Sequence, residues 1–170
     1  ADDEKRWLIA LIADTGMRLA EGAGLLKSDF IEHDGILSVN IRPHPWRPLK
    51  TASSARIIPL VGSAKWAAER ILAQPDSSQF AFPNYNDGQR TNANSASAAL
   101  NKWLKSKIGQ GYTIHSFRHS MRDRLRAVEC PSDVIDQIGG WLTQGVGNAY
   151  GEGYPTNILV KQLARVCISI

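Results

Sequence analysis

The segment that most constrains the fold lies near the start of the chain. Residues 3–13, DEKRWLIALIA, form one uninterrupted helical pattern that is apolar almost all round. Such a pattern is typical of a helix that is buried rather than one that carries a polar outer face. Gly16 follows as the signal that ends the helix. The rest of the chain must therefore supply the elements that cover this helix.

The patterns after Gly16 predict a mostly helical domain with a small sheet. HDG at 33–35 indicates a turn, and ILSVNI alternates as a strand does. Strands are expected at 36–41, 49–51 and 56–60, with the loop RPHPWRP between the first two. Helices are expected at 19–26, 63–74, 91–109, 115–129, 131–139 and 155–170. The fold class is therefore α+β, a single helical domain with a three-stranded antiparallel sheet near its N-terminal third.

Length and composition narrow the class of protein. A chain of 170 residues with 43% hydrophobic content suits one globular domain. It has no run of eighteen apolar residues, and its first residues are too acidic for a signal or transit peptide. We therefore expect no membrane association and a location in the bacterial cytoplasm or nucleoid. Cys130 and Cys167 match no metal or redox spacing, so both are expected to pack as small hydrophobic residues.

Positive charge is concentrated in IHSFRHSMRDRL at 114–125, whereas the chain as a whole has a net charge of only +4. At about 100° per residue, an apolar stripe on this helix lies beside a basic one. The basic stripe consists of His115, Arg118, His119, Arg122 and Arg126. Three interpretations fit: a solvated face paired with carboxylates, a zinc site at the two histidines, or a phosphate site bound by guanidinium groups. Periodicity alone does not choose among them, although the zinc interpretation is weakened because Arg118 lies between the histidines and no Glu fills the second position of a metalloprotease-type motif.

Five segments, read in order, resemble the signatures of the tyrosine recombinases, the phage-integrase family. The segments are TGMRLAEGAGLLKSDF at 15–30, LKTASSARIIPL at 49–60, HSFRH at 115–119, IGGW at 138–141, and Tyr150. Tyr150 lies nine residues after Trp141, which is the spacing that the family uses for its nucleophile. IGGW is similar to the variant in which Trp replaces the commoner His. YGEGY is most similar to integrases of temperate phages and prophages.

The resemblance implies a catalytic domain over residues 1–170, without the arm-binding and core-binding domains that such integrases also carry. It implies transesterification at a DNA phosphodiester through a 3′-phosphotyrosyl intermediate, in phage or prophage integration and excision. No cofactor and no metal are expected, because the covalent link keeps the phosphodiester energy. The expected partner is double-stranded DNA with an attachment-site core, bound by a homotetramer of the full-length protein.

The resemblance also implies a role for each matched residue. Arg18 and Arg118 would stabilise the charge on the phosphate oxygens, and Tyr150 would attack phosphorus. Lys50 would protonate the leaving 5′-oxygen, while His115 and Trp141 would hydrogen-bond the phosphate. Glu21 would steady the cluster as a supporting carboxylate. The expected DNA contacts are Arg56, His119 and Arg122.

Two alternatives stay open at this point. Tyr154, four residues after Tyr150, is a second possible nucleophile, although the spacing from Trp141 favours Tyr150. The domain could also bind DNA without cutting it, as a regulatory protein with the same fold. The presence of every catalytic residue type favours the enzyme.

Overall fold

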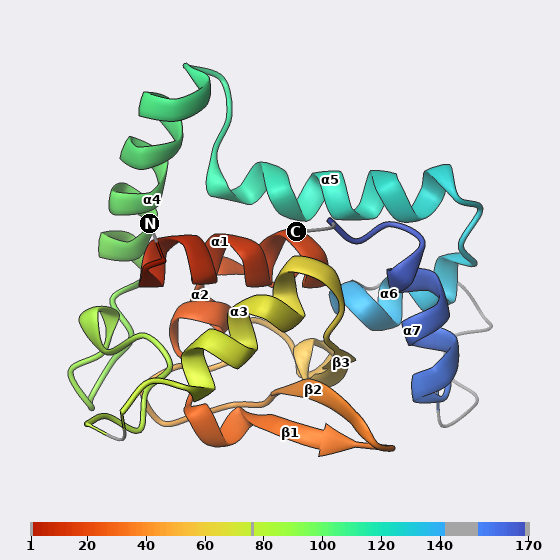
Figure 1. Cartoon of the computed structure of the whole chain (residues 1–170), viewed down its shortest axis with the longest axis horizontal. Helices are drawn as coiled ribbons and strands as arrows, with labels where there is room; N and C mark the ends of the chain where they lie inside the picture. Colours follow the sequence, from red (N-terminus) through yellow and green to blue (C-terminus); the bar gives the residue numbers. More distant parts are fainter. Residues whose placement is uncertain (1, 76, 142–152, 169–170) are drawn as a thin grey trace.

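The computed structural model describes residues 2–75, 77–141 and 153–168, and α1 (Glu4–Thr15) lies at its centre. Figure 1 shows α5 on one side of α1, and α3 and the sheet on the other. The side chain of Asp3 caps the first turn by accepting from the Arg6 N–H at 3.1 Å. Gly16, at φ 65°, ends the helix in the left-handed conformation. Leu8 and Leu11 are fully buried, as the apolar pattern predicts.

The sheet has three antiparallel strands in the order β1 (Phe30–His33), β2 (Ile36–Ile41) and β3 (Arg56–Pro59). The prediction of a strand at 49–51 is wrong. The third strand of the sheet is β1, which precedes β2 in the chain and pairs with the edge of β2 opposite β3. Asp34 and Gly35 both have positive φ, which builds a two-residue hairpin with His33 opposite Ile36. Residues 49–51 instead lead into a short 3-10 helix, η2 (Ala52–Ser54).

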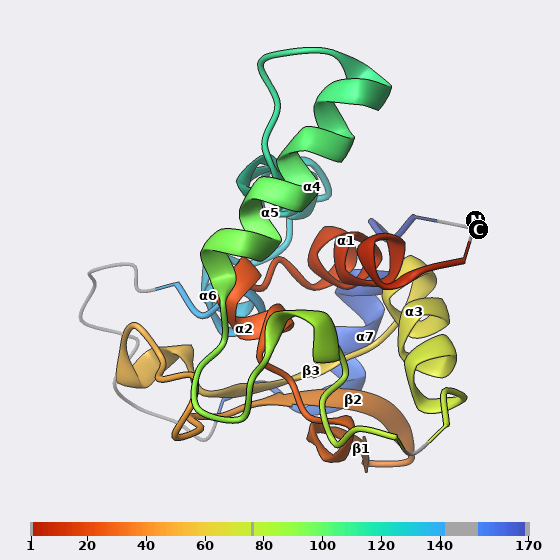
Figure 2. The same cartoon turned by 90° about the vertical axis from the view of Figure 1, so that its left-hand side faces the viewer.

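Most of the remaining elements are helices close to the predicted positions. Their bounds are α2 (Leu19–Ala23), α3 (Gly62–Leu72), α4 (Ala93–Ile108), α5 (Ile114–Ala127), α6 (Ser132–Gly139) and α7 (Thr156–Ala164). Two further 3-10 helices are η1 (Lys27–Asp29) and η3 (Pro83–Tyr85). Figure 2 shows α4 and its linker to α5 projecting from the rest of the domain. No helix in the described part of the chain has the length and apolarity needed to cross a bilayer.

The segment after α7 folds back onto the end of α1. Leu159, Leu163 and Val166 are buried in the common core. The buried carboxylate of Asp14 accepts hydrogen bonds from Ser63 and from the Ile168 N–H, the latter at 3.0 Å. Both cysteines are free; Cys130 is buried in the core, as expected, whereas Cys167 is partly exposed in the tail. The final helix is shorter than the pattern predicts, because residues 165–168 continue as a tail along α1 and α3.

Candidate active site

Arg18 lies at the point where the chain enters α2, directly after the turn that ends α1. Its backbone N–H donates to Glu21 Oε2 at 2.8 Å, which is half of a capping box. Its side-chain Nη1 donates to Glu21 Oε1 at 2.7 Å and to Ser54 Oγ at 2.9 Å. Within the described residues, no group accepts from Nε or Nη2. One edge of this guanidinium is therefore fixed while the other edge can bind a ligand.

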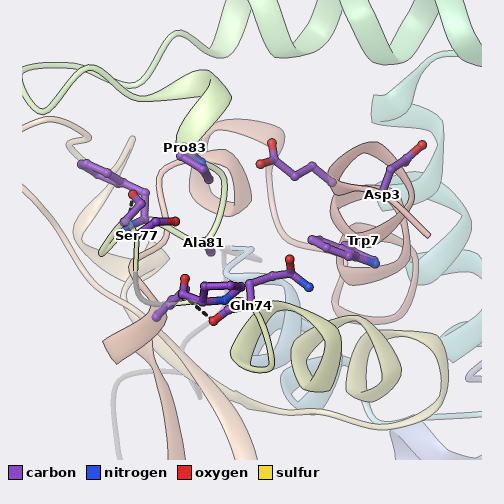
Figure 3. Close-up of a pocket in the computed structure, with 11 residues that line it drawn as sticks. Asp3, Trp7, Gln74, Ser77, Ala81 and Pro83 are labelled. Atoms are coloured by element: carbon purple, nitrogen blue, oxygen red, sulfur yellow. Dashed lines mark hydrogen bonds between the residues drawn. The ribbon is translucent and has the colours of Figure 1, made fainter. Parts of the chain in front are cut away.

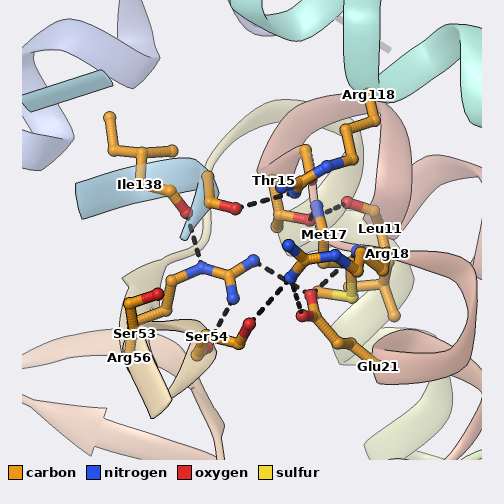
Figure 4. A network of polar contacts seen from close by, with 12 residues as sticks. Leu11, Thr15, Met17, Arg18, Glu21, Ser53, Ser54, Arg56, Arg118 and Ile138 are labelled. Carbon is orange, nitrogen blue, oxygen red and sulfur yellow. Dashed lines mark hydrogen bonds and ion pairs between the residues drawn. The ribbon is translucent and has the colours of Figure 1, made fainter. Parts of the chain in front are cut away.

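Glu21 lies between two arginines in the interior. Its side chain is nearly inaccessible and bonds Arg18 on one side and Nη2 of Arg56 at 3.1 Å on the other (Figure 4). Burial by itself raises the pKa of this carboxyl. The charge and hydrogen bond of Arg56 and the hydrogen bonds of Arg18 outweigh that effect, so the pKa lies below its ordinary value. Glu21 is therefore ionised, as a carboxylate that supports arginines must be.

Arg118 points inward from α5, although the helical pattern places it in the basic stripe. Its side chain is only 4% exposed, and its Nη1 donates to the carbonyls of Gly16 and Gly139, the latter at 2.7 Å. Burial, followed by the charges of Arg18 and Arg56, lowers the pKa of Arg118 to about 10. The guanidinium therefore stays charged at neutral pH. As with Arg18, its Nε and Nη2 have no partner within the described part of the chain.

The two glycines of IGGW explain how Trp141 is placed. A Cβ at Gly139 would lie 1.8 Å from the Trp141 ring, so the indole lies directly against this glycine. Gly140 has φ 61°, and a Cβ there would meet Nη1 of Arg56 at 2.7 Å. The guanidinium of Arg118 lies 4.4 Å from the Trp141 ring centroid. Trp141 thus packs on the face of Arg118, and both residues are predicted to contact the same phosphate.

We refer to Arg18, Glu21, Arg56 and Arg118 as the arginine cluster. His115 and Lys50 are exposed and lie beside it. Partial burial, and then the charges of His119, Arg118, Arg18 and Lys50, lower the pKa of His115 below its ordinary value of 6.5. The imidazole is therefore mostly neutral at neutral pH and can accept a proton. Lys50 is exposed, and its hairpin is tied to the cluster through Thr51, whose hydroxyl lies 2.9 Å from Ser54 Oγ.

The three residues predicted to contact DNA differ in position. His119 is exposed and lies edge-on to His115, with ring centroids 4.8 Å apart. Arg122 is half-buried, with its guanidinium 5.3 Å from the Trp141 ring centroid. Arg56 is buried, with a side chain 4% exposed, and each of its nitrogens bonds a group inside the protein. Its position does not suit the predicted DNA contact.

Tyr150 lies outside the described residues, but the alternative nucleophile does not. The Tyr154 hydroxyl donates to Asp133 Oδ2 at 2.6 Å, and its backbone exchanges two hydrogen bonds with Gln137. The hydrogen bond to Asp133 raises the pKa of Tyr154. A tyrosine held in this way on α6 is poorly placed to attack a phosphate at Arg118.

A separate cleft of about 320 Å³ lies between the start of α1 and residues 74–83. Figure 3 shows Trp7 on one wall and Ala81 and Pro83 on another. None of the residues predicted for the site lines this cleft. No group of three or more potential metal ligands occurs within the described ranges, so the pair His115 and His119 finds no third ligand there.

Charge imbalance is the main property of the cluster. Arg18 and Arg56 both bond the carboxylate of Glu21, and Arg118 lies on the other side of Arg18, within reach of these charges (Figure 4). Lys50 and His115 add to the positive potential at its exposed side. Guanidinium groups with a fixed orientation and free N–H edges match the oxygens of a phosphate. The arrangement can therefore bind an oxyanion and stabilise additional negative charge on it.

Comparison with known proteins identifies the family. The sequence profile described as the phage integrase family matches residues 2–153. The chain belongs to the phage integrase family. No curated protein matches the sequence significantly.

Solved structures support the same assignment at the level of the fold. The Tn1549 transposon integrase in complex with circular intermediate DNA is 19% identical with a TM-score of 0.56; the match covers 96% of this chain and 55% of that one. The XerH site-specific recombinase bound to its difH substrate is 18% identical with a TM-score of 0.55, over 82% and 40% of the two chains. The chain spans about half the length of the integrase that it matches. It has the catalytic-domain fold of tyrosine recombinases.

Several residues of this integrase-family site have no signal in the sequence. Ser54 joins the Lys50 hairpin to Arg18, and the carbonyls of Gly16 and Gly139 hold Arg118. Backbone acceptors cannot be identified from residue type. The adjacent glycines of IGGW are the one signal that could have indicated a crowded position there.

Proposed function

We propose that this domain cleaves and rejoins DNA strands through a covalent 3′-phosphotyrosyl intermediate. The observation that carries the proposal is the pair Arg18 and Arg118. Each guanidinium is anchored through Nη1, and neither has a described partner at Nε or Nη2. Their charges act on each other, since repulsion from Arg18 helps to lower the pKa of Arg118. A shared anion would relieve that repulsion.

The anion that fits the family is a DNA phosphodiester. In the proposed step the Tyr150 oxygen attacks phosphorus, the P–O5′ bond breaks, and the strand is left as a 3′-phosphotyrosyl ester. The transition state carries more negative charge on the non-bridging oxygens than the ground state does. Two preorganised guanidinium groups stabilise that difference, and one such donor typically contributes about 10²–10³-fold in rate.

Two proton transfers accompany the step. Lys50, exposed on its hairpin, would give a proton to the leaving 5′-oxygen. His115, whose lowered pKa keeps it neutral, would take the proton of the Tyr150 hydroxyl. The attack of a 5′-hydroxyl from another strand on the phosphotyrosyl ester reverses both transfers and rejoins the DNA. Trp141 would donate its indole N–H to a phosphate oxygen while packing on Arg118.

The wider role that we propose is integration or excision of a mobile element such as a phage or prophage. The substrate would be double-stranded DNA carrying a core site, bound by four copies of the full-length protein. His119 and Arg122, beside the phosphate cluster, would contact the DNA backbone without reading bases. The structurally similar proteins support a DNA substrate, since the Tn1549 integrase and XerH structures contain DNA.

The proposal is tested by trapping the covalent intermediate. The chain is incubated with nicked duplexes whose sequence around the nick is randomised, so that the short cleaved strand diffuses away and the adduct accumulates. We expect a protein–DNA adduct that survives denaturing electrophoresis with the wild type and disappears with Tyr150→Phe. Salt-sensitive DNA retardation without any adduct would instead indicate a DNA-binding protein that does not cut. An adduct that persists in Tyr150→Phe would show that the nucleophile is another residue.

A further inference from the structure

Arg56, at the start of β3, is bonded to three separate segments. Its Nε donates to the Ile138 carbonyl at 2.8 Å, and its Nη1 donates to the Ser54 carbonyl at 2.6 Å. Its Nη2 donates to Glu21 Oε2 at 3.1 Å. Figure 4 shows this guanidinium between the α2, η2 and α6 segments. One planar group therefore fixes the relative positions of three parts of the fold.

Each of these segments carries a residue to which the proposed function assigns a catalytic role. Glu21 holds Arg18 through two hydrogen bonds. Ser54 accepts from Arg18 and neighbours Thr51, the residue after Lys50. Ile138 begins the IGGW segment, in which a Cβ on Gly140 would press on the Arg56 guanidinium before the chain reaches Trp141. Arg56 thus contacts the supports of three candidate groups and none of the groups themselves.

Direct contact between Arg56 and DNA does not fit this position. The side chain is 4% exposed, and all three nitrogens already donate to protein oxygens. Burial of a guanidinium is costly, and a single carboxylate faces it. Retaining such a group is physically reasonable where its fork geometry holds several acceptors in fixed directions.

We propose that Arg56 is a positioning residue that aligns Arg18, Lys50 and Trp141 for the strand-cleavage reaction. The inference rests on the proposed function, since it assigns Arg56 a part in that reaction. The inference predicts that a positive charge alone does not replace the guanidinium. All three donors of a lysine are on one nitrogen, whereas the three acceptors around Arg56 are spaced to meet three separate nitrogens. Supporting residues of this kind typically contribute about 10–100-fold to activity when they orient the groups that react.

The test compares Arg56→Lys with Arg124→Lys. Arg124 is a matched control because it also bridges three groups, namely Asp14 and the carbonyls of Ala13 and Val166. Both variants lose internal hydrogen bonds, but among the described residues Arg124 bonds none of Glu21, Ser54 and Ile138. At saturating nicked DNA we expect the single-turnover rate of adduct formation to fall about 10–100-fold in Arg56→Lys. The rate of Arg124→Lys should match the wild type.

Two further readouts separate positioning from simple loss of stability. DNA affinity should be unchanged in Arg56→Lys, whereas a DNA-contacting arginine would lose affinity and keep its rate at saturation. The effects of Arg56→Lys and Glu21→Gln should be strongly non-additive, since both act through the same Arg18 support. If Arg56→Lys does not fold, Gly140→Asn keeps Arg56 and tolerates positive φ while its Cβ displaces the guanidinium, and the same loss of rate is expected.

The outcomes distinguish the inference from the proposed function. A wild-type adduct together with an unchanged rate in Arg56→Lys overturns the inference and leaves the function standing. Absence of any wild-type adduct overturns the proposed function. The alignment of Arg18 is then tested by measuring how much inorganic sulfate raises the Tm of each protein. A sulfate-dependent rise in Tm that persists in Arg124→Lys and disappears in Arg56→Lys supports the inference. An equal rise in all three proteins, or none in any, overturns it.

Discussion

Arg118 and Arg124 lie on the same helix, and both donate to backbone carbonyls at the end of α1, but their surroundings differ. Arg124 meets the buried carboxylate of Asp14, and the carbonyls of Ala13 and Val166 take its remaining terminal donors. Arg118 meets two carbonyls and two other arginines, and it keeps an edge with no described partner. The first cluster is balanced and holds the C-terminal tail. The second has more arginines than carboxylates, because Glu21 is shared among Arg18, Arg56 and Arg118.

This difference shows which property marks a site in this fold. The number of internally bonded arginines is not sufficient, since both clusters have them. The useful marker is a preorganised donor edge that has no described protein partner and is not sealed in the interior, unlike the buried Nε of Arg124. By the same criterion Arg56 belongs with Arg124, because both terminal nitrogens of each are engaged within the protein.

The sharpest test of the comparison is to replace each of these two arginines with glutamine. Arg118→Gln and Arg124→Gln should both lower the free energy of unfolding by about 1–3 kcal/mol, because each leaves internal acceptors without a donor. Only Arg118→Gln should lower the single-turnover rate of adduct formation, by about 10²–10³-fold. Denaturant unfolding and the trapping assay measure the two quantities. Equal losses of rate in both variants would remove the distinction between the clusters.

A second prediction concerns the only carboxylate in the arginine network of Figure 4. The folded pKa of Glu21 lies below its ordinary value of 4.5, so ionised Glu21 stabilises the fold above that pH. This contribution is lost as the pH falls through the folded pKa. The free energy of unfolding should therefore fall more steeply in the wild type than in Glu21→Gln below about pH 4.5. A constant difference between the two proteins across that range would contradict the assignment.

The smallest effect is expected at Tyr154. Its hydroxyl is held by Asp133 and its backbone by Gln137, away from the arginine cluster. Tyr154→Phe should form adduct at the wild-type rate with little change in Tm, whereas Tyr150→Phe should form none. Loss of adduct in Tyr154→Phe, measured on the same gel, would reverse the choice between the two tyrosines.

The sequence predicts much of this fold because the helical signals are local. The apolar segment at 3–13 and the strand at 36–41 both appear near their predicted places. The strand error at 49–51 arose because the third strand lies before the turn at Asp34 and Gly35, as β1 (Phe30–His33), and not after β2. A four-residue strand gives only a weak alternation signal. The position of each motif residue follows from the pattern, but its accessibility does not.

Arg118 and Arg56 illustrate that limit. Helical periodicity puts Arg118 in the basic stripe, yet the carbonyls of Gly16 and Gly139 draw it inward. Arg56 has the residue type of a DNA contact, yet it is buried between Glu21 and the end of α6. In both cases the deciding partners are backbone carbonyls or residues distant in the chain, which residue types alone do not reveal.

The central claim is that Arg18 and Arg118 hold one phosphate, and a double-mutant cycle tests it most directly. Arg18→Lys, Arg118→Lys and the double variant are compared by single-turnover adduct formation at saturating DNA. If both guanidinium groups act on the same phosphate, the double variant should lose much less rate than the product of the two single losses. Losses that multiply independently would contradict a shared anion and, with it, this account of the site.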